Sequence, residues 1–468
     1  MVSCMNRKLL VIATPLKSFP AGGFLRSYNI LTQALDLLSQ NGIEIELYVP
    51  ISDLVEFLAT QATSNPDVDI DSTIKRIEQE LSIFTRYSST FQRLFPELIE
   101  LLERGYCSWS KMFSGKLSRV TSFGLIYPNI YLELKRVLET ECIRMYVENL
   151  HKVNAIYSMN DGIGALRSLY YFSEKLNTNA ALMLQATPYI EPKFGIKIFH
   201  PKIVPSIYIG RSMKRLIIKI IKTGKLKLLL SVSPAPIVEA RSLINYVKKY
   251  YVHIYIPKPA NAFDPVLLSY RKTKGKRLKA VYFGRLIPDK GLYDLPIIWK
   301  IVERTLPEAE LHLFGTFQSE RYREKFFRIV NMLRLKNVFY QGYVPHGEKL
   351  FHRVADAKIL IYPSYSDSFS LTVLEAVALG LAVVAYNIPA LRHVYRDLPC
   401  VRLVPVGDKR RLALEASKIL LMADEEYRRL HENRVVKEFI EIHSSWRNVA
   451  YSEFSAVLNV LNIGEQDD

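Results

Sequence analysis

The chain has 468 residues, 49% of them hydrophobic and 23% charged. This is enough for two or three folded domains, and it excludes a disordered, collagen-like or small disulfide-stapled protein. The formal net charge of +17 is concentrated in residues 191–279, which hold 20 Lys and Arg against 3 Asp and Glu. A local cationic block of this size predicts a surface that meets an anionic partner.

The cysteines and the apolar runs indicate the compartment. The four cysteines lie far apart in the sequence and form neither a zinc-site spacing nor a disulfide framework, which is typical of a reducing cytoplasm. No apolar run approaches the roughly 20 residues needed to cross a bilayer, and the apolar stretch near the start is too short for a signal peptide. We therefore expect a cytoplasmic protein, either free or peripheral at the inner face of the cell membrane.

The first elements in chain order predict an α/β sheet. A short apolar strand beginning near Lys8 is followed by a loop with Gly22 and Gly23, a helix, and an alternating strand over 43–49. Residues from about 52 to 118 then change to helical spacing. They predict a helical insertion, which is either a lid or acceptor-facing arm or a packed elaboration of the domain. Further strands are predicted at 155–158, 181–185 and 228–233.

The second half of the chain repeats the α/β rhythm after a polar, basic stretch at 271–277 that indicates a domain boundary. Amphipathic helices, for example 291–304 and 320–335, separate predicted strands at 280–283, 310–314, 338–341, 359–362 and 382–385. This alternation predicts a second parallel sheet covered on both faces. Two such domains would leave a ligand cleft between the carboxyl ends of their strands.

The first candidate motif follows the strand at 280–283. Gly284 lets the backbone approach a ligand closely, and Arg285 and Lys290 place two positive charges beside a helix start at Gly291. Two cations in this position suit a pyrophosphate. A turn with solvated charges is the alternative interpretation.

The second candidate motif follows the strand at 359–362, where Asp367 precedes Glu375 by eight residues. If Ser370 caps the helix, Glu375 lies just over one turn inside it, and the amides of residues 369–371 (Phe369, Ser370 and Leu371) would point into the cleft to hold phosphate or sugar oxygens. Each carboxylate can accept two hydrogen bonds from a diol. The alternative is that Glu375 merely interacts with the helix start and that Asp367 is a loop residue.

Together the two motifs resemble the donor-binding domain of family 4 glycosyltransferases. Matches in the same order along the chain are Gly22-Gly23, Ser231-Val-Ser233, Asn261-Ala-Phe-Asp264, Gly284-Arg285, Lys290-Gly291, Pro363-Ser364, the acids Asp367 and Glu375, Gly380, and Ser445-Trp446. The resemblance implies the GT-B fold, in which two Rossmann-like domains face each other across a cleft. It places an acceptor-binding domain at 1–264, a donor-binding domain at 265–440, and a final helix at 441–468 that returns to the first domain.

The resemblance also implies residue roles in the donor domain. Arg285 and Lys290 would hold the donor diphosphate and neutralise the leaving group. Glu375 would bind the nucleotide ribose, and Asp367 would bind hydroxyls of the transferred sugar. The reaction would retain the anomeric configuration without a metal or other cofactor, because two fixed cations can stabilise a departing nucleotide diphosphate.

The first domain would contribute its own residues to the same site. The Gly22-Gly23 loop, with Arg26 nearby, would approach the phosphates. Asn160 and Asp161, after the strand at 155–158, would face the sugar, although an ordinary turn is the favoured interpretation of Asp161-Gly162.

Six positions depart from the family pattern. Asp367 stands where the family usually has Glu, Ser368 and Ser370 replace common glycines, Tyr386-Asn387 replace a Gly-Gly pair, and Phe317 fills the second position of a frequent Gly-x-Gly. We expect side chains in place of glycine to narrow the donor pocket, so the family does not identify the donor.

Basic residues recur at helical spacing in 211–222, where Arg211, Lys214, Arg215, Lys219 and Lys222 alternate with apolar residues. A cationic amphipathic helix suits an anionic membrane surface, but an ordinary helix packed on the sheet has the same pattern. We expect a transferase that uses a nucleotide-sugar donor and a lipid-linked or membrane-proximal glycan acceptor. The alternatives are a soluble enzyme of the same fold, such as a sugar-phosphate synthase or a sugar-nucleotide epimerase, and, less favoured, a nucleic-acid-binding protein.

Overall fold

The computed structural model describes residues 7–17, 22–64, 69–113, 128–150, 152–186, 203–238 and 241–463. Two compact units divide the chain. One comprises Met1–Val232, Pro236–Ala260 and Val449–Asp468, and the other comprises Ser233–Ala235 and Asn261–Asn448. Each unit is a parallel six-stranded sheet with helices, which confirms the predicted α/β class.

The sheet of the first unit has the order β2-β1-β3-β4-β5-β6. Its strands are β1 (Arg7–Ile12), β2 (Ile43–Tyr48), β3 (Ala155–Ser158), β4 (Ala180–Leu184), β5 (Leu226–Ser231) and β6 (His253–Tyr255). All five neighbouring pairs are parallel. The interior strands are apolar and buried, as continuous hydrophobic runs predict. The sequence did not predict β6, whose three residues are exposed and carry no apolar run.

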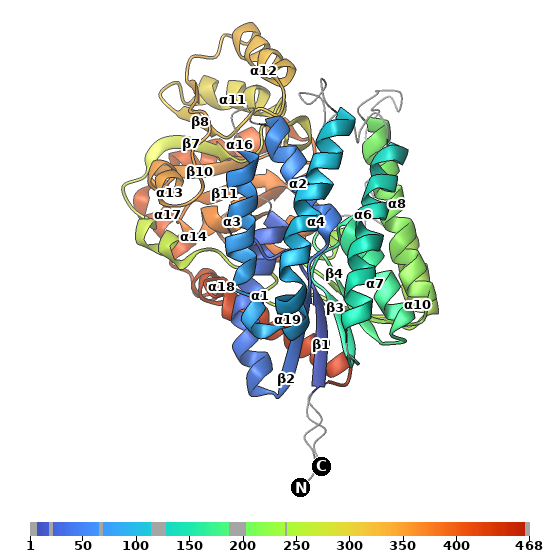
Figure 1. Cartoon of the computed structure of the whole chain (residues 1–468). Helices are drawn as coiled ribbons and strands as arrows, with labels where there is room; N and C mark the ends of the chain where they lie inside the picture. The colour runs from blue at the N-terminus through green and yellow to red at the C-terminus, as the bar shows by residue number, and fades with distance from the viewer. Residues whose placement is uncertain are drawn as a thin grey trace. The chain divides into compact units, whose positions relative to one another are not determined.

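Helices surround this sheet (Figure 1). They are α1 (Gly22–Gln40), α2 (Ile51–Ser64), α3 (Ile70–Ser82), α4 (Ser89–Phe113), α6 (Pro128–Asn149), α7 (Ile163–Lys175), α8 (Ile203–Lys222) and α10 (Arg241–Lys249). Helices α2, α3 and α4, with a short 3-10 helix at Thr85–Tyr87, confirm the predicted helical insertion, whose last residues, 114–118, lie outside the described part of the chain. Helix α4 packs on α2, α6 and β2, and it buries Leu94, Leu98 and Leu102. The insertion is therefore a packed part of the first unit.

The last helix, α19 (Trp446–Val460), belongs to the first unit from Val449 onward. Its Glu453 is fully buried and accepts hydrogen bonds from Arg26 of α1 and from the Tyr157 hydroxyl of β3. The ring of Phe454 packs edge-on against Tyr157. These contacts confirm that the C-terminal helix returns to the first domain.

The sheet of the second unit has the order β12-β11-β10-β7-β8-β9. Its strands are β7 (Arg277–Phe283), β8 (Glu310–Phe314), β9 (Val338–Tyr340), β10 (Ala357–Tyr362), β11 (Ala382–Tyr386) and β12 (Val401–Val404). The first five were predicted, whereas β12 was not. Its helices are α11 (Asp294–Thr305), α12 (Glu320–Met332), α13 (Glu348–Val354), α14 (Leu371–Ala378), α15 (Pro389–Tyr395), α16 (Lys409–Leu421), α17 (Asp424–His431) and α18 (Arg434–His443).

The helix predicted to begin at Gly291 begins three residues later. Pro288–Lys290 form a single 3-10 turn, and Gly291 ends it in the left-handed conformation at φ 75°. Helix α11 then starts at Asp294. This turn places Lys290 in the loop after β7.

Candidate functional site

The two sequence motifs follow β7 and β10, which are neighbours in the middle of the second sheet. The chain adds β8 and β9 on one side of β7 and then crosses to its other side to add β10, β11 and β12. In an open α/β sheet this reversal opens a crevice at the carboxyl ends of the two strands, where ligands bind. The structure thus brings the predicted motifs together at the expected position.

Gly291 allows the two loops to approach closely. A Cβ atom at this position would lie 2.1 Å from the carbonyl oxygen of Pro363, and the backbone φ of 75° also favours glycine. The amide of Tyr365 donates to the carbonyl of Asp289 at 3.0 Å and fastens the loops at a second point. A side chain at 291 would push the loops apart.

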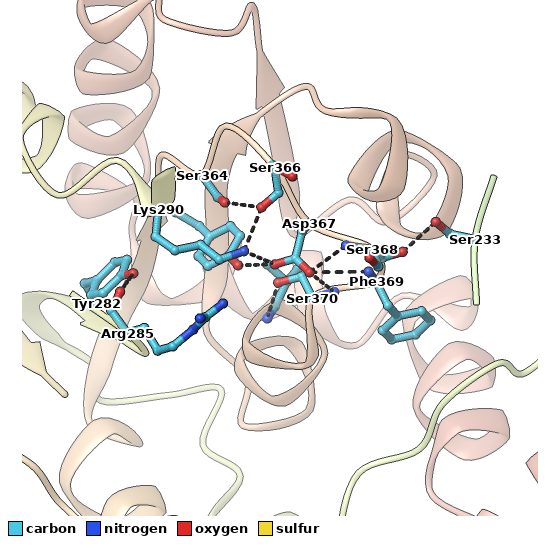
Figure 2. Close-up of polar contacts among 12 residues, drawn as sticks. Ser233, Tyr282, Arg285, Lys290, Ser364, Ser366, Asp367, Ser368, Phe369 and Ser370 are labelled. Atoms are coloured by element: carbon cyan, nitrogen blue, oxygen red, sulfur yellow. Dashed lines mark hydrogen bonds and ion pairs between the residues drawn. The ribbon is translucent and has the colours of Figure 1, made fainter. Parts of the chain in front are cut away.

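Lys290 crosses from the first loop to the second. Its Nζ lies 2.9 Å from Asp367 Oδ2 and donates to the carbonyl oxygen of Ser366 at 2.6 Å (Figure 2). The side chain is 13% exposed, so the ammonium group remains reachable from one side. The predicted cation and the predicted acid therefore form an ion pair.

Asp367 organises its own loop. Its Oδ1 accepts hydrogen bonds from the amides of Ser368 (2.8 Å) and Ser370 (3.2 Å), with Phe369 at 3.4 Å, and its Oδ2 also accepts from the Tyr362 hydroxyl at 2.5 Å. Burial raises the pKa of Asp367, but Lys290, Tyr362 and the loop amides together bring that pKa below its usual value. The amides of Phe369 and Ser370 were predicted to point at a ligand; in this structure they donate to Asp367 instead.

Helix α14 begins where the sequence predicted. Ser370 is its N-cap, and the Ser370 hydroxyl accepts from the amide of Val373 at 3.4 Å, so Leu371 is the first helical residue. Ser370 has φ 71°, a left-handed conformation that favours the glycine it replaces. The Tyr395 hydroxyl donates to the Ser370 carbonyl at 2.8 Å and holds this turn in place.

Glu375 lies on α14 just over one turn after its start, and its side chain is 10% exposed. Its Oε1 lies 2.7 Å from Nε2 of His346, in the loop between β9 and α13. His346 was not among the residues predicted from the sequence. The signal available was its place in a loop that follows a predicted strand, at the same edge of the sheet as both motifs.

Arg285 is exposed, and its guanidinium makes no hydrogen bond or ion pair with any residue that the structure describes. The Tyr282 hydroxyl donates to the Arg285 carbonyl at 2.9 Å and fixes the backbone where it leaves β7. Gly284, at φ 142°, precedes it. Figure 2 shows the Arg285 and Lys290 side chains extending toward the loop that carries Asp367.

The comparisons with known proteins agree with this geometry. The sequence profile of the family described as Glycosyl transferases group 1 matches residues 270–435, the segment that contains both motifs and the whole second sheet. Residues 270–435 thus match the group 1 glycosyl transferases. The family predicted from the motifs is confirmed.

Two curated relatives align with part of this chain. The poly(glycerol-phosphate) alpha-glucosyltransferase of Bacillus subtilis is 30% identical over 133 residues, which are 28% of this chain and 18% of that protein. The O-antigen chain mannosyltransferase B of Escherichia coli is 30% identical over 181 residues, which are 36% of this chain and 46% of that protein. The chain thus spans less than half the length of both relatives.

A solved structure extends the similarity to the whole fold. HepE of Anabaena, crystallised with UDP and glucose, superposes with a TM-score of 0.56 and 14% identity over 97% of this chain and 99% of its own. The chain thus has the two-domain GT-B fold.

The residues predicted in the first unit are placed differently. Gly22 and Gly23 lie in the first turn of α1, not in a loop. Arg26 is 3% exposed and binds Glu453 and the carbonyl of Ala260. The prediction that Arg26 approaches the donor phosphates was wrong, because its charge is already paired inside the unit.

Asn160 and Asp161 hold the loops of the first unit together. Asn160 Oδ1 accepts from the amide of Thr14 at 2.9 Å, and Asp161 Oδ2 accepts from the amides of Gln185 and Ala186 at 2.9 Å each. Burial raises the pKa of Asp161 to about 6. Both side chains thus serve the backbone, in line with the favoured interpretation of a turn.

Two of the residues that depart from the family pattern, Tyr386 and Phe317, make contacts inside the second unit. Tyr386 is fully buried, and its hydroxyl donates to Asp294 at 2.7 Å beside the hydroxyl of Tyr365. It joins β11 to α11 inside the domain, so the expectation that Tyr386 narrows a pocket was wrong. Phe317 packs against the rings of Phe326 and Tyr340.

A metal site was not predicted. Within the described ranges, no group of three or more His, Cys, Asp or Glu side chains is arranged to hold a metal ion. Metal independence stays a prediction.

Proposed function

We propose that this protein transfers a sugar from a nucleotide-sugar donor to a glycan acceptor, with retention of the anomeric configuration and without a metal. The observation that carries the proposal is the placement of Arg285, Lys290 and Glu375 around the reversal point of the second sheet. Group 1 membership of this domain and the bound UDP of HepE support a nucleotide donor.

The cations have a direct chemical task. Cleavage of the sugar–phosphate bond leaves a nucleotide diphosphate, and fixed positive charges lower the free energy of the transition state in which that charge develops. Arg285 is exposed and ready to bind phosphate oxygens, whereas Lys290 would bridge the diphosphate and Asp367. Arg285 and Lys290 thus take the role that a divalent ion fills elsewhere.

Attack from the same face as the leaving group fits this arrangement. We propose that the leaving phosphate accepts the acceptor's proton, which needs no enzymatic nucleophile. Asp367 is bound by Lys290, Tyr362 and its own loop amides, so its carboxylate is poorly placed to attack a sugar carbon. In this proposal Asp367 meets hydroxyls of the transferred sugar only after it gives up some of these contacts.

Calorimetry with UDP, GDP and ADP tests the donor. We expect one of the three to bind the wild type, and Arg285→Ala to weaken it tenfold or more, because one charge-assisted contact contributes roughly 1.5–3 kcal/mol. Arg429→Ala, a highly exposed arginine on α17, is the matched control and should leave affinity unchanged. If none of the three nucleotides binds the wild type, the proposed donor is wrong.

For the acceptor, we propose a lipid-linked or membrane-proximal glycan at the inner face of the cell membrane. The support is a cationic surface on the first unit, here called the α8–α10 surface, which comprises Arg211, Arg215, Lys219 and Lys222 of α8 with Lys248 and Lys249 of α10. All six are exposed, and α8 packs directly on α10. The four residues of α8 form one stripe about 16 Å long, because they recur at the helical repeat.

The positive charge of this surface is not balanced by carboxylates on the same helices, since the described parts of α8 and α10 contain no Asp or Glu. Each basic residue near an anionic bilayer contributes up to about 1 kcal/mol of attraction. Among the described residues no helix is long and apolar enough to span a membrane. The poly(glycerol-phosphate) named for the Bacillus subtilis relative is itself an anionic polymer.

Sedimentation with vesicles separates this acceptor from a soluble one. We expect binding to vesicles that contain anionic lipid, loss of binding at high salt, and none to neutral vesicles. A protein that turns over a donor but never sediments would instead be a soluble enzyme of the same fold, such as a sugar-phosphate synthase.

A further inference from the structure

The loop between β9 and α13 brings His346 against the carboxylate of Glu375. The imidazole is about half exposed, whereas the carboxylate is 10% exposed. Glu375 is fixed by its helix, and the distance of 2.7 Å between Nε2 and Oε1 is a full hydrogen bond. The imidazole thus covers one of the two oxygens of a nearly buried acid.

A ribose and His346 would compete for the same oxygen. A diol binds a carboxylate best through both of its oxygens, and Oε1 is already engaged. We propose that His346 holds Glu375 while the donor site is empty and releases it to the nucleotide ribose, and that nucleotide binding is therefore coupled to loss of a proton from His346. This inference rests on the proposed function, in which Glu375 is the ribose ligand.

The charges around His346 favour its protonated form in the free enzyme. The hydrogen bond to Glu375 raises the pKa of His346, burial opposes this, and the negative charges of Glu375 and of Asp264, at the N-cap of the 3-10 helix η3 (Pro265–Tyr270), add to the increase. From α13 the uncharged ring of Phe351 packs edge-on against it. Once separated from Glu375, the imidazole loses the largest of these effects and its proton is released more easily.

The His346 side chain has room to move, because it is about half exposed. Gly342 and Gly347 bound its loop with φ values of 74° and 115°, and a Cβ atom at either position would meet nothing within 4 Å. The imidazole can therefore turn away from Glu375 toward solvent by rotation of its own side chain.

Calorimetry across pH 6 to 8 tests the inference with the nucleotide that binds the wild type. We expect wild-type affinity to rise with pH, by at most tenfold per pH unit, because one proton is released per nucleotide bound. His346→Ala should bind more tightly than the wild type at pH 6, and its advantage should disappear toward pH 8. Comparing the two proteins removes the titration of the nucleotide's own phosphate.

A second readout counts the proton directly. Binding enthalpies in buffers of different ionisation enthalpy should show more proton release for the wild type than for His346→Ala at pH 6.5. His352→Ala, an exposed histidine on α13, is the control and should behave as the wild type. His346→Gln, which can keep a hydrogen bond to Glu375 without a charge, should also lose the excess proton release.

Two failures remain distinguishable. If no nucleotide binds the wild type, the proposed function itself fails. If a nucleotide binds, but the wild type and His346→Ala release equal numbers of protons, or the variant binds more weakly at every pH, then only the competition between His346 and the ribose is wrong.

Discussion

The basic side chains in two parts of the same cationic block differ in their exposure to solvent. In the stretch 271–279 three of the six basic side chains turn inward and bind backbone carbonyls, whereas the basic residues of the α8–α10 surface stay in solvent. From composition alone, both parts predict a surface that meets an anionic partner. Their contacts show that the basic residues of the α8–α10 surface are all exposed to such a partner, whereas half of those in 271–279 are engaged inside the fold.

The inward cations bind the ends of helices. Arg271 donates to the carbonyls of Val377 and Ala378 at the end of α14, and Lys276 donates to Ala355 just after α13. Helix C-termini leave carbonyls without an intrahelical donor and carry partial negative charge. A cation there donates hydrogen bonds to these carbonyls and is attracted by the negative charge. These cations contribute to folding.

Removing Arg271 should produce the largest effect. Arg271→Ala removes the side-chain donor from the carbonyls of Val377, Ala378 and His431, of which Val377 keeps the amide of its own helix end, and we expect a loss of about 2–4 kcal/mol in the free energy of unfolding. Urea denaturation measures this loss. Lys274→Ala, an exposed neighbour, should change stability by less than about 0.5 kcal/mol. Equal effects of the two substitutions would erase the distinction between inward and outward cations.

Sequence alone could locate much of the fold because its strands are strong apolar runs. The five strands predicted for the second sheet all form, whereas β6 and β12 are short and lack a continuous buried run. Arg285, Lys290 and Glu375 could be placed because strand ends in a parallel sheet meet at one edge.

Other features needed coordinates because they depend on distant partners. The family resemblance placed Arg26 near the donor phosphates, yet its carboxylate partner, Glu453, lies 427 residues further along the chain. His346 meets Glu375 although 29 residues separate them in the chain and β7 and β8 lie between β9 and β10 in the sheet. No local pattern encodes either pairing.

The buried acid Asp161 has no cation as a partner among the residues that the structure describes. Within that part of the chain its hydrogen-bond partners are backbone amides, and burial raises its pKa from 3.8 to about 6. Since the folded-state pKa lies above the unfolded one, its contribution to stability is fully present below about pH 4 and is lost as pH rises through 6.

We therefore expect the change in the free energy of unfolding caused by Asp161→Asn to be more stabilising at pH 7 than at pH 4, by on the order of 2 kcal/mol. The reason is that the uncharged amide oxygen of Asn can accept the same hydrogen bonds. Denaturant midpoints of both proteins at pH 4, 5, 6 and 7 measure the difference. A constant offset between the two curves would show that Asp161 ionises in the fold as readily as in the unfolded chain.

Substitutions on the α8–α10 surface should have the smallest effect on folding. The triple variant Arg215→Ser, Lys222→Ser and Lys248→Ser removes exposed charges, of which only Lys222 has a described partner, the Tyr246 ring at 5.4 Å. Each substitution should change stability by about 0.5 kcal/mol or less, while binding to anionic vesicles should fall on the order of a hundredfold, at up to about 1 kcal/mol per charge. Arg271→Ala should show the reverse pattern, unstable but still vesicle-bound at temperatures where it is folded. A triple variant that unfolds easily would mean that these cations, like those of 271–279, are part of the structure, and the acceptor would have to be sought away from the membrane.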